Sequence, residues 1–448
     1  MKQLHVIGFI LLLFIWGSQL AAQTILSDSL YFEATNSYRT YKVWLPADYD
    51  SSQQYQTIYC LDASLLFNAL CANVEVYADP SVGKLPPSIV IGLYFDQRND
   101  DMGILWNESA LDPTGQAFKS FIENKLIPTI ETRFSVSPYR SIVGHSNSST
   151  YIQFFLWDKH PAFQGYLAMS MFALKKDTER FCALQVDPAH PIDLVYVSAK
   201  NDAEFRFNSG TVLENLLDSC THNGLRSRHL IFEHADHISM ALQGMPLGLE
   251  TLYKDFAYQP IPSDSLLESV SIQGSPLKVI DSLVRGRSAK YGTLPKYTFD
   301  DLNALYDLYV LQKDSIHISV ATQKYVELFP EDSDHHFYEA QHLEMMGAYY
   351  SAEKQYLMHL QTYSDPGYWA HMRLIWLYSG PLKKPQEAIH WCLVAYKKLG
   401  SIEFLDQVVK LCSKYPALRD KAIADLEATG SSKEIKSYLE RLQAIKKE

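Results

Sequence analysis

Strand-like and helix-like patterns alternate along the first half of this chain. Arg39–Leu45 alternates apolar and polar residues as an edge strand does, whereas Ser88–Tyr94 is almost continuously apolar, as in a strand covered on both faces. Gln116–Phe134 places its apolar residues on one helical face. Further strands are predicted at 30–34, 55–61, 142–143, 164–169, 192–198 and 228–233, and further helices from 65 and at 150–157, 177–184, 212–220 and 239–256. This alternation predicts an α/β fold, a mostly parallel sheet with helices on both faces.

Strand patterns disappear from about residue 298, and helical patterns take their place. Gly347–Ala352 followed by Tyr356 fits the second half of a tetratricopeptide-like (TPR-like) unit, and small residues recur at the same spacing further on, at Ala388, Cys392 and Ala395. Small residues let paired helices approach closely. A generic array of helical hairpins fits the pattern as well. The aromatic residues of this region are expected in its core: Tyr349, Tyr350, Trp369, Trp376 and Trp391.

The N-terminus has the pattern of a secretory signal peptide. Lys2 precedes the apolar run Val6–Trp16, and small residues lead to a cleavage site after Ala22. The run is short for a membrane span, and no later segment is apolar enough for one. We therefore expect a periplasmic or secreted protein without a membrane span in the mature chain. The predicted parts are a signal peptide at 1–22, an α/β domain at 23–257, a connecting region at 258–297 and a helical domain at 298–448.

Composition narrows the classes of partner and cofactor. A net charge of −11 over 448 residues, with no basic patch to offset it, argues against nucleic acid. The six cysteines show neither CxxC nor metal-ligand spacing, and His335-His336 has no further ligand near it in sequence. No metal and no cofactor are expected. Two local disulfides remain open, Cys182 with Cys220 or Cys392 with Cys412, and free buried cysteines are the default expectation.

The segment Gly144-His145-Ser146-Asn147-Ser148 carries the most informative chemistry. It follows a β-branched run and precedes a helix-capable segment, which is the outline of a nucleophile elbow with Ser146 at its apex. The strained turn needs small residues two positions either side of the nucleophile, and Gly144 and Ser148 stand there. The alternative is a chance Gly-x-Ser motif beside a helix, with Ser146 or Ser148 as the N-cap.

Two more polar residues lie just past predicted strands. Asp202 follows the strand at 192–198 and His237 follows the strand at 228–233. Because the carboxyl ends of parallel strands share one edge of a sheet, Ser146, Asp202 and His237 are expected to meet there. Their order along the chain is that of the α/β-hydrolase triad. Glu204 is an alternative acid and His234 an alternative base.

Several of these segments together resemble the esterase D / enterochelin-esterase-like family of α/β-hydrolases, which also contains mycolyltransferases and feruloyl esterases. The resemblance covers roughly residues 30–256. This chain has Ala63 and Ser148 where the family commonly has glycine. The matching segments are Val43–Tyr49, Ile58–Ala63, Phe121–Ile127, Gly144-His145-Ser146 and Asp236-His237.

The resemblance implies a serine esterase that works through an acyl-enzyme. Ser146 would attack the acyl carbonyl, His237 would act as general base, and Asp202 would orient the histidine. Backbone N–H groups of Asn147 and of Ser64, with Ala63 as the alternative, would bind the oxyanion. The implied substrate is a small-molecule or polysaccharide-linked acyl ester.

Two other functions remain open. The chain could be an acyltransferase, in which an acceptor alcohol replaces water at the acyl-enzyme. It could also be a weakly active or inactive hydrolase fold that serves, with its helical repeats, as a scaffold for a protein partner.

Overall fold

The computed structural model describes residues 24–445 except 174, 221–223, 260–262, 313, 331, 333 and 363–366. The predicted signal peptide at 1–22 lies outside these residues. The chain folds into two compact units. One comprises the described residues up to Gln259 together with Val284–Lys296, and the other comprises the described residues of Pro260–Leu283 and Tyr297–Glu448.

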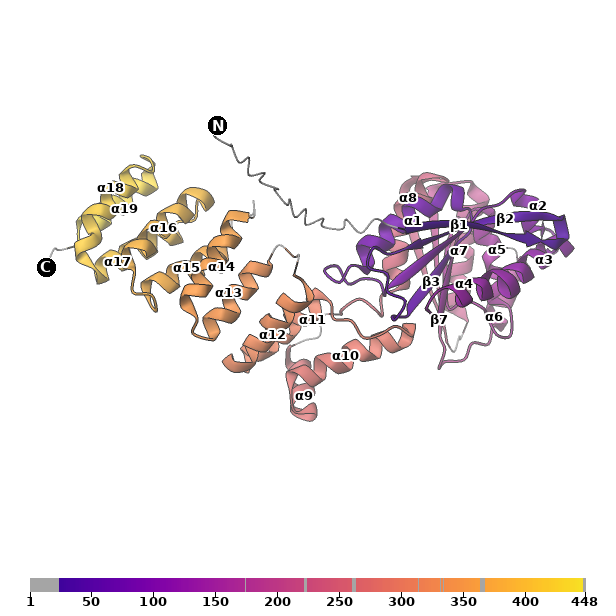
Figure 1. Ribbon diagram of the computed structural model, residues 1–448. Helices are drawn as coiled ribbons and strands as arrows, with labels where there is room; N and C mark the ends of the chain where they lie inside the picture. The colour runs from indigo at the N-terminus through magenta and orange to yellow at the C-terminus, as the bar shows by residue number, and fades with distance from the viewer. Residues whose placement is uncertain are drawn as a thin grey trace, which may run out of the picture. The chain divides into compact units, whose positions relative to one another are not determined.

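An eight-stranded sheet forms the centre of the first unit (Figure 1). The spatial order is β1-β2-β4-β3-β7-β8-β9-β10; β1 and β2 run antiparallel to their neighbours, and the other strands are parallel. This confirms the predicted mostly parallel α/β sheet. The strands are β1 (Thr24–Phe32), β2 (Ser37–Leu45), β3 (Tyr55–Cys60), β4 (Ser88–Leu93), β7 (Val136–His145), β8 (Gly165–Met169), β9 (Ile192–Asn201) and β10 (Leu225–Asp236).

Helices cover both faces of this sheet because the central strands are apolar on both sides. On β3, Ile58 and Cys60 pack into one core cluster and Tyr59 into the other. The first cluster is closed by α1 (Ala63–Ala78) and α8 (Ser239–Leu252). The second is closed by α3 (Pro113–Phe121), α4 (Ile127–Arg133), α5 (Asn147–Leu156), α6 (Lys175–Ala183) and α7 (Glu204–Ser219).

The amphipathic segment predicted as one helix at Gln116–Phe134 is interrupted. A π turn, η2 (Ile122–Leu126), separates α3 from α4. Pro128 lies two residues after its end, and proline lacks the N–H that would continue the regular ladder. Short elements without a clear periodicity were not predicted: η1 (Glu33–Thr35), α2 (Arg98–Met102) and the hairpin β5 (Ile104–Leu105) with β6 (Ala110–Leu111).

The described part of the second unit is all-helical, and from α11 (Phe299–Leu311) onwards each helix packs against the next one along the chain. The segment at 258–297, expected as a connecting region, contains two helices of its own, α9 and α10, and the second half of α10, from Val284, belongs to the first unit. The helices are α9 (Ser263–Gln273), α10 (Pro276–Tyr291), α11 (Phe299–Leu311), α12 (Ser315–Leu328), α13 (His335–Met345), α14 (Tyr349–Thr362), α15 (Tyr368–Ser379), α16 (Pro385–Leu399), α17 (Glu403–Lys414), η3 (Pro416–Leu418), α18 (Arg419–Glu427) and α19 (Lys433–Gln443).

Small and aromatic residues of this unit behave differently. The repeated small residues are fully buried between helices, as their spacing predicts: Ala352, Ala388, Cys392 and Ala395. The core expectation is wrong for three aromatic side chains, since Tyr350, Trp369 and Trp376 are 69%, 68% and 46% exposed. They lie on the outer faces of amphipathic helices, where periodicity and not residue type decides burial. The TPR-like assignment itself stays a prediction.

One disulfide ties two helices of the first unit together. Cys182 and Cys220 form a bridge between α6 and the end of α7, with Cα atoms 5.5 Å apart. The default expectation of free cysteines is therefore wrong for this pair, whereas Cys60, Cys71, Cys392 and Cys412 are free and buried. In the described ranges, every helix is too short or too polar to span a bilayer.

Candidate active site

Ser146 sits at the sharp turn between β7 and α5. Its φ of 61° and ψ of −122° place it in a conformation that L-residues rarely adopt. The Ser146 N–H donates to the carbonyl of Met169 at 2.8 Å, which holds the turn. A Cβ on Gly144 would lie 2.8 Å from the backbone of Ser148, so only glycine fits there. This local geometry is that of a nucleophile elbow.

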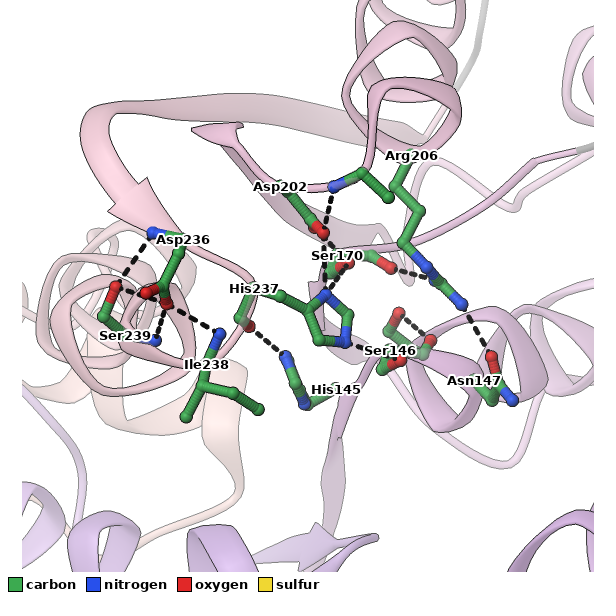
Figure 2. Close-up of polar contacts among 12 residues, drawn as sticks. His145, Ser146, Asn147, Ser170, Asp202, Arg206, Asp236, His237, Ile238 and Ser239 are labelled. Carbon is green, nitrogen blue, oxygen red and sulfur yellow. Dashed lines mark hydrogen bonds and ion pairs between the residues drawn. The ribbon is translucent and has the colours of Figure 1, made fainter.

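His237 links Ser146 to Asp202 (Figure 2). Its Nε2 lies 3.0 Å from Ser146 Oγ, and its Nδ1 lies 2.8 Å from Asp202 Oδ1. Because a carboxylate can only accept, Nδ1 carries the proton and Nε2 is left to accept from the serine hydroxyl. The three predicted side chains therefore meet, although they follow three different strands.

The Asp202 carboxylate is held by further donors. Its side chain is only 2% exposed. Its Oδ1 also accepts from the Ala203 N–H at 2.6 Å, and its Oδ2 accepts from Ser170 Oγ at 2.6 Å. Ser170 was not predicted, yet it directly follows β8, so the same rule of strand carboxyl ends would have found it.

The alternative acid and base do not join this cluster. Glu204 is the exposed first residue of α7, and His234 is exposed on β10. Asp236, next to the histidine, turns to α8 instead, where its Oδ1 accepts from the N–H groups of Ile238 and Ser239 (Figure 2). The hydrogen bonds from Ser239, first of all from its backbone N–H, lower the pKa of Asp236.

His145 supports the backbone beneath His237. Its Nε2–H donates to the His237 carbonyl at 2.7 Å, and the two rings lie 4.7 Å apart. The His145 side chain is buried, and burial lowers its pKa to about 4. It is therefore neutral at physiological pH and acts as a hydrogen-bond donor rather than as a charge.

The two predicted oxyanion donors both lie in the first turn of a helix. Asn147 is the first residue of α5 and Ser64 is the second residue of α1, so neither N–H has an acceptor within its own helix. Ala63, the alternative, is buried at the first position of α1. Helix N-termini favour developing negative charge. The choice among these donors stays a prediction.

A polar pocket adjoins the Asn147 side chain. Its volume is about 270 Å³. The ring of Trp106, one of the lining residues, contacts Phe172, which in turn contacts the exposed Phe205. The pocket is lined by Asn99, Asp100, Met102, Gly103, Ile104, Trp106, Asp112 and Asn147.

Two arginines that were not predicted as site residues fix this region. Arg206, on α7, donates to the Ser170 carbonyl and to Asn147 Oδ1, both at 2.6 Å. Arg98 forms a two-pronged ion pair with Asp62 and also donates to the His145 carbonyl at 3.0 Å. No sequence periodicity marks either residue, because each acts through contacts between distant segments.

A cluster of potential metal ligands lies in the second unit. Within the described residues, His335, His336 and Glu339 bring potential ligand atoms within 4.8 Å of one another. Nδ1 of His336 already contacts Gln355 Oε1 at 2.8 Å. The expected absence of a metal stays a prediction.

Comparison with known proteins agrees with this geometry. Residues 33–170 match the family model Esterase, described as "Putative esterase". The match includes Ser64, Ser146 and Asn147 and ends before Asp202 and His237. No curated protein matches the chain.

Two solved structures share the fold at low sequence identity. An uncharacterised protein from Capnocytophaga ochracea aligns with a TM-score of 0.56 and 17% identity, over 80% of this chain and 100% of that chain. An IroE-like serine hydrolase from Shewanella oneidensis aligns with a TM-score of 0.52 and 20% identity, over 67% of this chain and 98% of that chain. Together, the sheet topology and the family match over residues 33–170 indicate an α/β-hydrolase fold of the esterase type for the first unit.

Proposed function

We propose that this chain is an exported serine esterase whose triad is Ser146, His237 and Asp202. The observation that carries the proposal is the continuous chain of hydrogen bonds from Ser146 Oγ through His237 to Asp202 Oδ1, at 3.0 and 2.8 Å. A nucleophile needs a base within hydrogen-bonding reach, and the base needs a group that orients it. The site supplies all three at one edge of the sheet.

The reaction proceeds by acyl transfer to the serine and then to water. Ser146 Oγ bonds to the acyl carbon while its proton passes to His237 Nε2, and the carbonyl π electrons move to the oxygen. The backbone N–H groups of Asn147 and Ser64 stabilise this oxyanion. Collapse expels the alcohol, which takes the proton from His237. Water then attacks the acyl-enzyme by the same steps, releasing the acid and restoring Ser146.

The pocket beside Asn147 supports a small polar ester as the substrate. Beside the apolar side chains of Met102, Ile104 and Trp106, its lining presents carboxylates and amides, from Asp100, Asp112, Asn99 and Asn147. Such groups can bond hydroxyls, whereas a long acyl chain would need an apolar lining. We therefore expect turnover to fall steeply as the acyl chain of a p-nitrophenyl ester lengthens beyond a few carbons.

Export is supported by the disulfide in the first unit. The Cys182–Cys220 bridge is stable in an oxidising compartment such as the periplasm or the extracellular medium. The predicted signal peptide at 1–22 accounts for delivery there. Fractionation of cells that express the full chain, with the mature N-terminus determined by mass spectrometry, tests cleavage after Ala22.

Fluorophosphonate labelling tests the triad directly. The wild type should be labelled, Ser146→Ala should show no labelling, and His237→Ala should be labelled far more slowly. His234→Ala is the matched control, since that exposed histidine lies three residues away on the same segment. Steady-state turnover of a short-chain ester should fall by about 10⁴ to 10⁶ in Ser146→Ala. A folded wild type that is neither labelled nor active would leave the scaffold function in its place, and preferential transfer to an added alcohol would favour the acyltransferase.

A further inference from the structure

Ser148 occupies the elbow position where related esterases commonly have glycine, and its hydroxyl is engaged. The residue is fully buried, with 0% exposure. Its Oγ accepts from the His145 N–H at 2.8 Å and donates to Asp62 Oδ2 at 2.7 Å. Glycine could make neither bond. The side chain therefore connects the elbow to a residue 86 positions earlier in the chain.

Asp62 is the residue directly before α1, whose second residue, Ser64, is the proposed oxyanion donor. It precedes α1 with φ 55° and ψ 42°, a left-handed conformation that is rare for a residue with a side chain. It is 7% exposed, and its carboxylate accepts hydrogen bonds from Ser148 Oγ and from two guanidinium nitrogens of Arg98. A buried carboxylate is stable only while its hydrogen bonds are satisfied. The donors on Asp62 therefore hold the residue that leads into the first turn of α1.

Arg98 closes the connection into a ring. Two of its nitrogens, Nε and Nη2, donate to Asp62, and Nη2 also donates to the His145 carbonyl at 3.0 Å. Ser148 holds the N–H of the same His145. Hydrogen bonds therefore connect the elbow, α2 and the start of α1. The four residues that make them are Asp62, Arg98, His145 and Ser148, and the nucleophile Ser146 directly follows His145.

We propose that Ser148 is a positioning residue that sets the oxyanion donors of α1 against Ser146 through Asp62 and Arg98. The inference rests on the proposed function, because the aligned donors matter only if an oxyanion forms at Ser146. Donors that stabilise a transition state must lie within a few tenths of an ångström of their place. A displaced first turn of α1 would therefore slow the chemical step, whereas substrate binding in the pocket beside Asn147 would stay nearly intact.

Four variants measure this effect: Ser148→Ala, Ser148→Gly, Asp62→Asn and the double variant Ser148→Ala/Asp62→Asn. Each single variant should lower kcat about 10- to 100-fold with KM changed less than about threefold, since displacement of catalytic groups by about 1 Å costs up to 10²-fold. The double variant should lose much less than the product of the single losses, because both changes break one connection. Ser141→Ala is the matched control, a buried serine of β7, the strand that leads into the elbow, whose hydroxyl partner is Tyr253.

Ser148→Gly distinguishes the proposal from the alternative that Ser148 has no positioning role and only crowds the turn of the elbow. If serine only crowds the elbow, restoring the glycine common in the family should raise kcat, and that result would overturn the proposal. Arg98→Ala supplies a second route that leaves Ser148 unchanged. Because Arg98 is 34% exposed, added guanidinium can reach its site and should recover part of kcat in Arg98→Ala but not in Ser146→Ala. Absence of any recovery would contradict the role of the Arg98–Asp62 contact.

Hydrogen exchange keeps the inference testable without turnover. The N–H groups of Leu65 and Leu66 donate to the Asp62 carbonyl, at 2.9 and 3.1 Å. They should exchange faster in Ser148→Ala than in the wild type and in Ser141→Ala. If the wild type proves inactive while this exchange changes as expected, the proposed function fails and the connection stands. If the wild type is active and Ser148→Ala matches it in kcat and in exchange, the positioning role is wrong.

Discussion

The two units of this protein are built from contacts of very different range. In the hydrolase unit, His237 contacts Ser146 across 91 positions and Asp202 across 35. In the helical unit, α13 packs on α14 and α15 on α16, each helix against its successor in the chain. Reactive chemistry therefore depends on the topology of the whole sheet, whereas the helical unit depends on repeated local packing. Substitutions at the site in the hydrolase unit should accordingly change catalytic rates, whereas substitutions in the helical unit should change only the stability of that unit.

The largest expected effect comes from breaking the long-range cluster at its acid. Asp202→Asn should lower kcat/KM about 10⁴-fold, because an amide in place of the carboxylate no longer fixes the tautomer of His237 that can accept from Ser146. Thermal unfolding of the helical unit should not change. Glu204→Gln, two residues away and exposed, is the control and should stay within about twofold of the wild type. Equal losses in both variants would show that Asp202 is not the acid.

The next effect concerns stability within the hydrolase unit alone. The Cys182–Cys220 bridge closes a loop with a sequence separation of 38. Its removal in Cys182→Ser/Cys220→Ser should lower the free energy of unfolding of this unit by about 3–4 kcal/mol, since the unfolded chain gains freedom. Denaturant unfolding with and without reductant measures this loss of stability. Reductant should lower the unfolding midpoint of the wild type and leave that of the double variant unchanged. An unchanged midpoint in the double variant would contradict this expectation.

Acid should weaken the hydrolase unit through His145. Its folded pKa of about 4 lies below its ordinary value of 6.5. Between these values the unfolded state binds more protons than the folded state, so stability falls as pH decreases from about 6.5 to 4. The full loss is roughly 3 kcal/mol, from 1.36 kcal/mol per pKa unit. Urea unfolding across this range should show a shallower dependence in His145→Gln, and parallel curves would exclude His145 as the cause.

The smallest effect should be confined to the helical unit. Ala388, on α16, is fully buried, so Ala388→Leu overfills a close helix contact and should cost about 1–3 kcal/mol of stability there. The kcat of the esterase reaction should remain unchanged. Gln386→Leu introduces the same side chain at an exposed neighbouring position and serves as the control. A loss of activity in Ala388→Leu alone would show that the helical unit contributes to the site after all.

Periodicity along the chain correctly predicts most elements of the fold. Strands β4, β8 and β9 begin and end close to their expected residues, because apolar runs of that length have few other stable arrangements. Periodicity misses helix breaks and short elements. The π turn η2 depends on how Pro128 perturbs the ladder, and α2 has too few residues to show a period.

The amino-acid sequence by itself determined the α/β class and the outline of the elbow around Ser146, and it predicted Asp202 and His237 as candidate partners, since each follows a recognisable strand. Only the tertiary structure decided which acid and which histidine meet the serine, that Ser170 and Arg206 support them, and that Ser148 reaches Asp62. The reason is physical. Period and turn chemistry act over a few neighbouring residues, whereas a buried hydrogen bond between distant segments exists only once the sheet has brought them together.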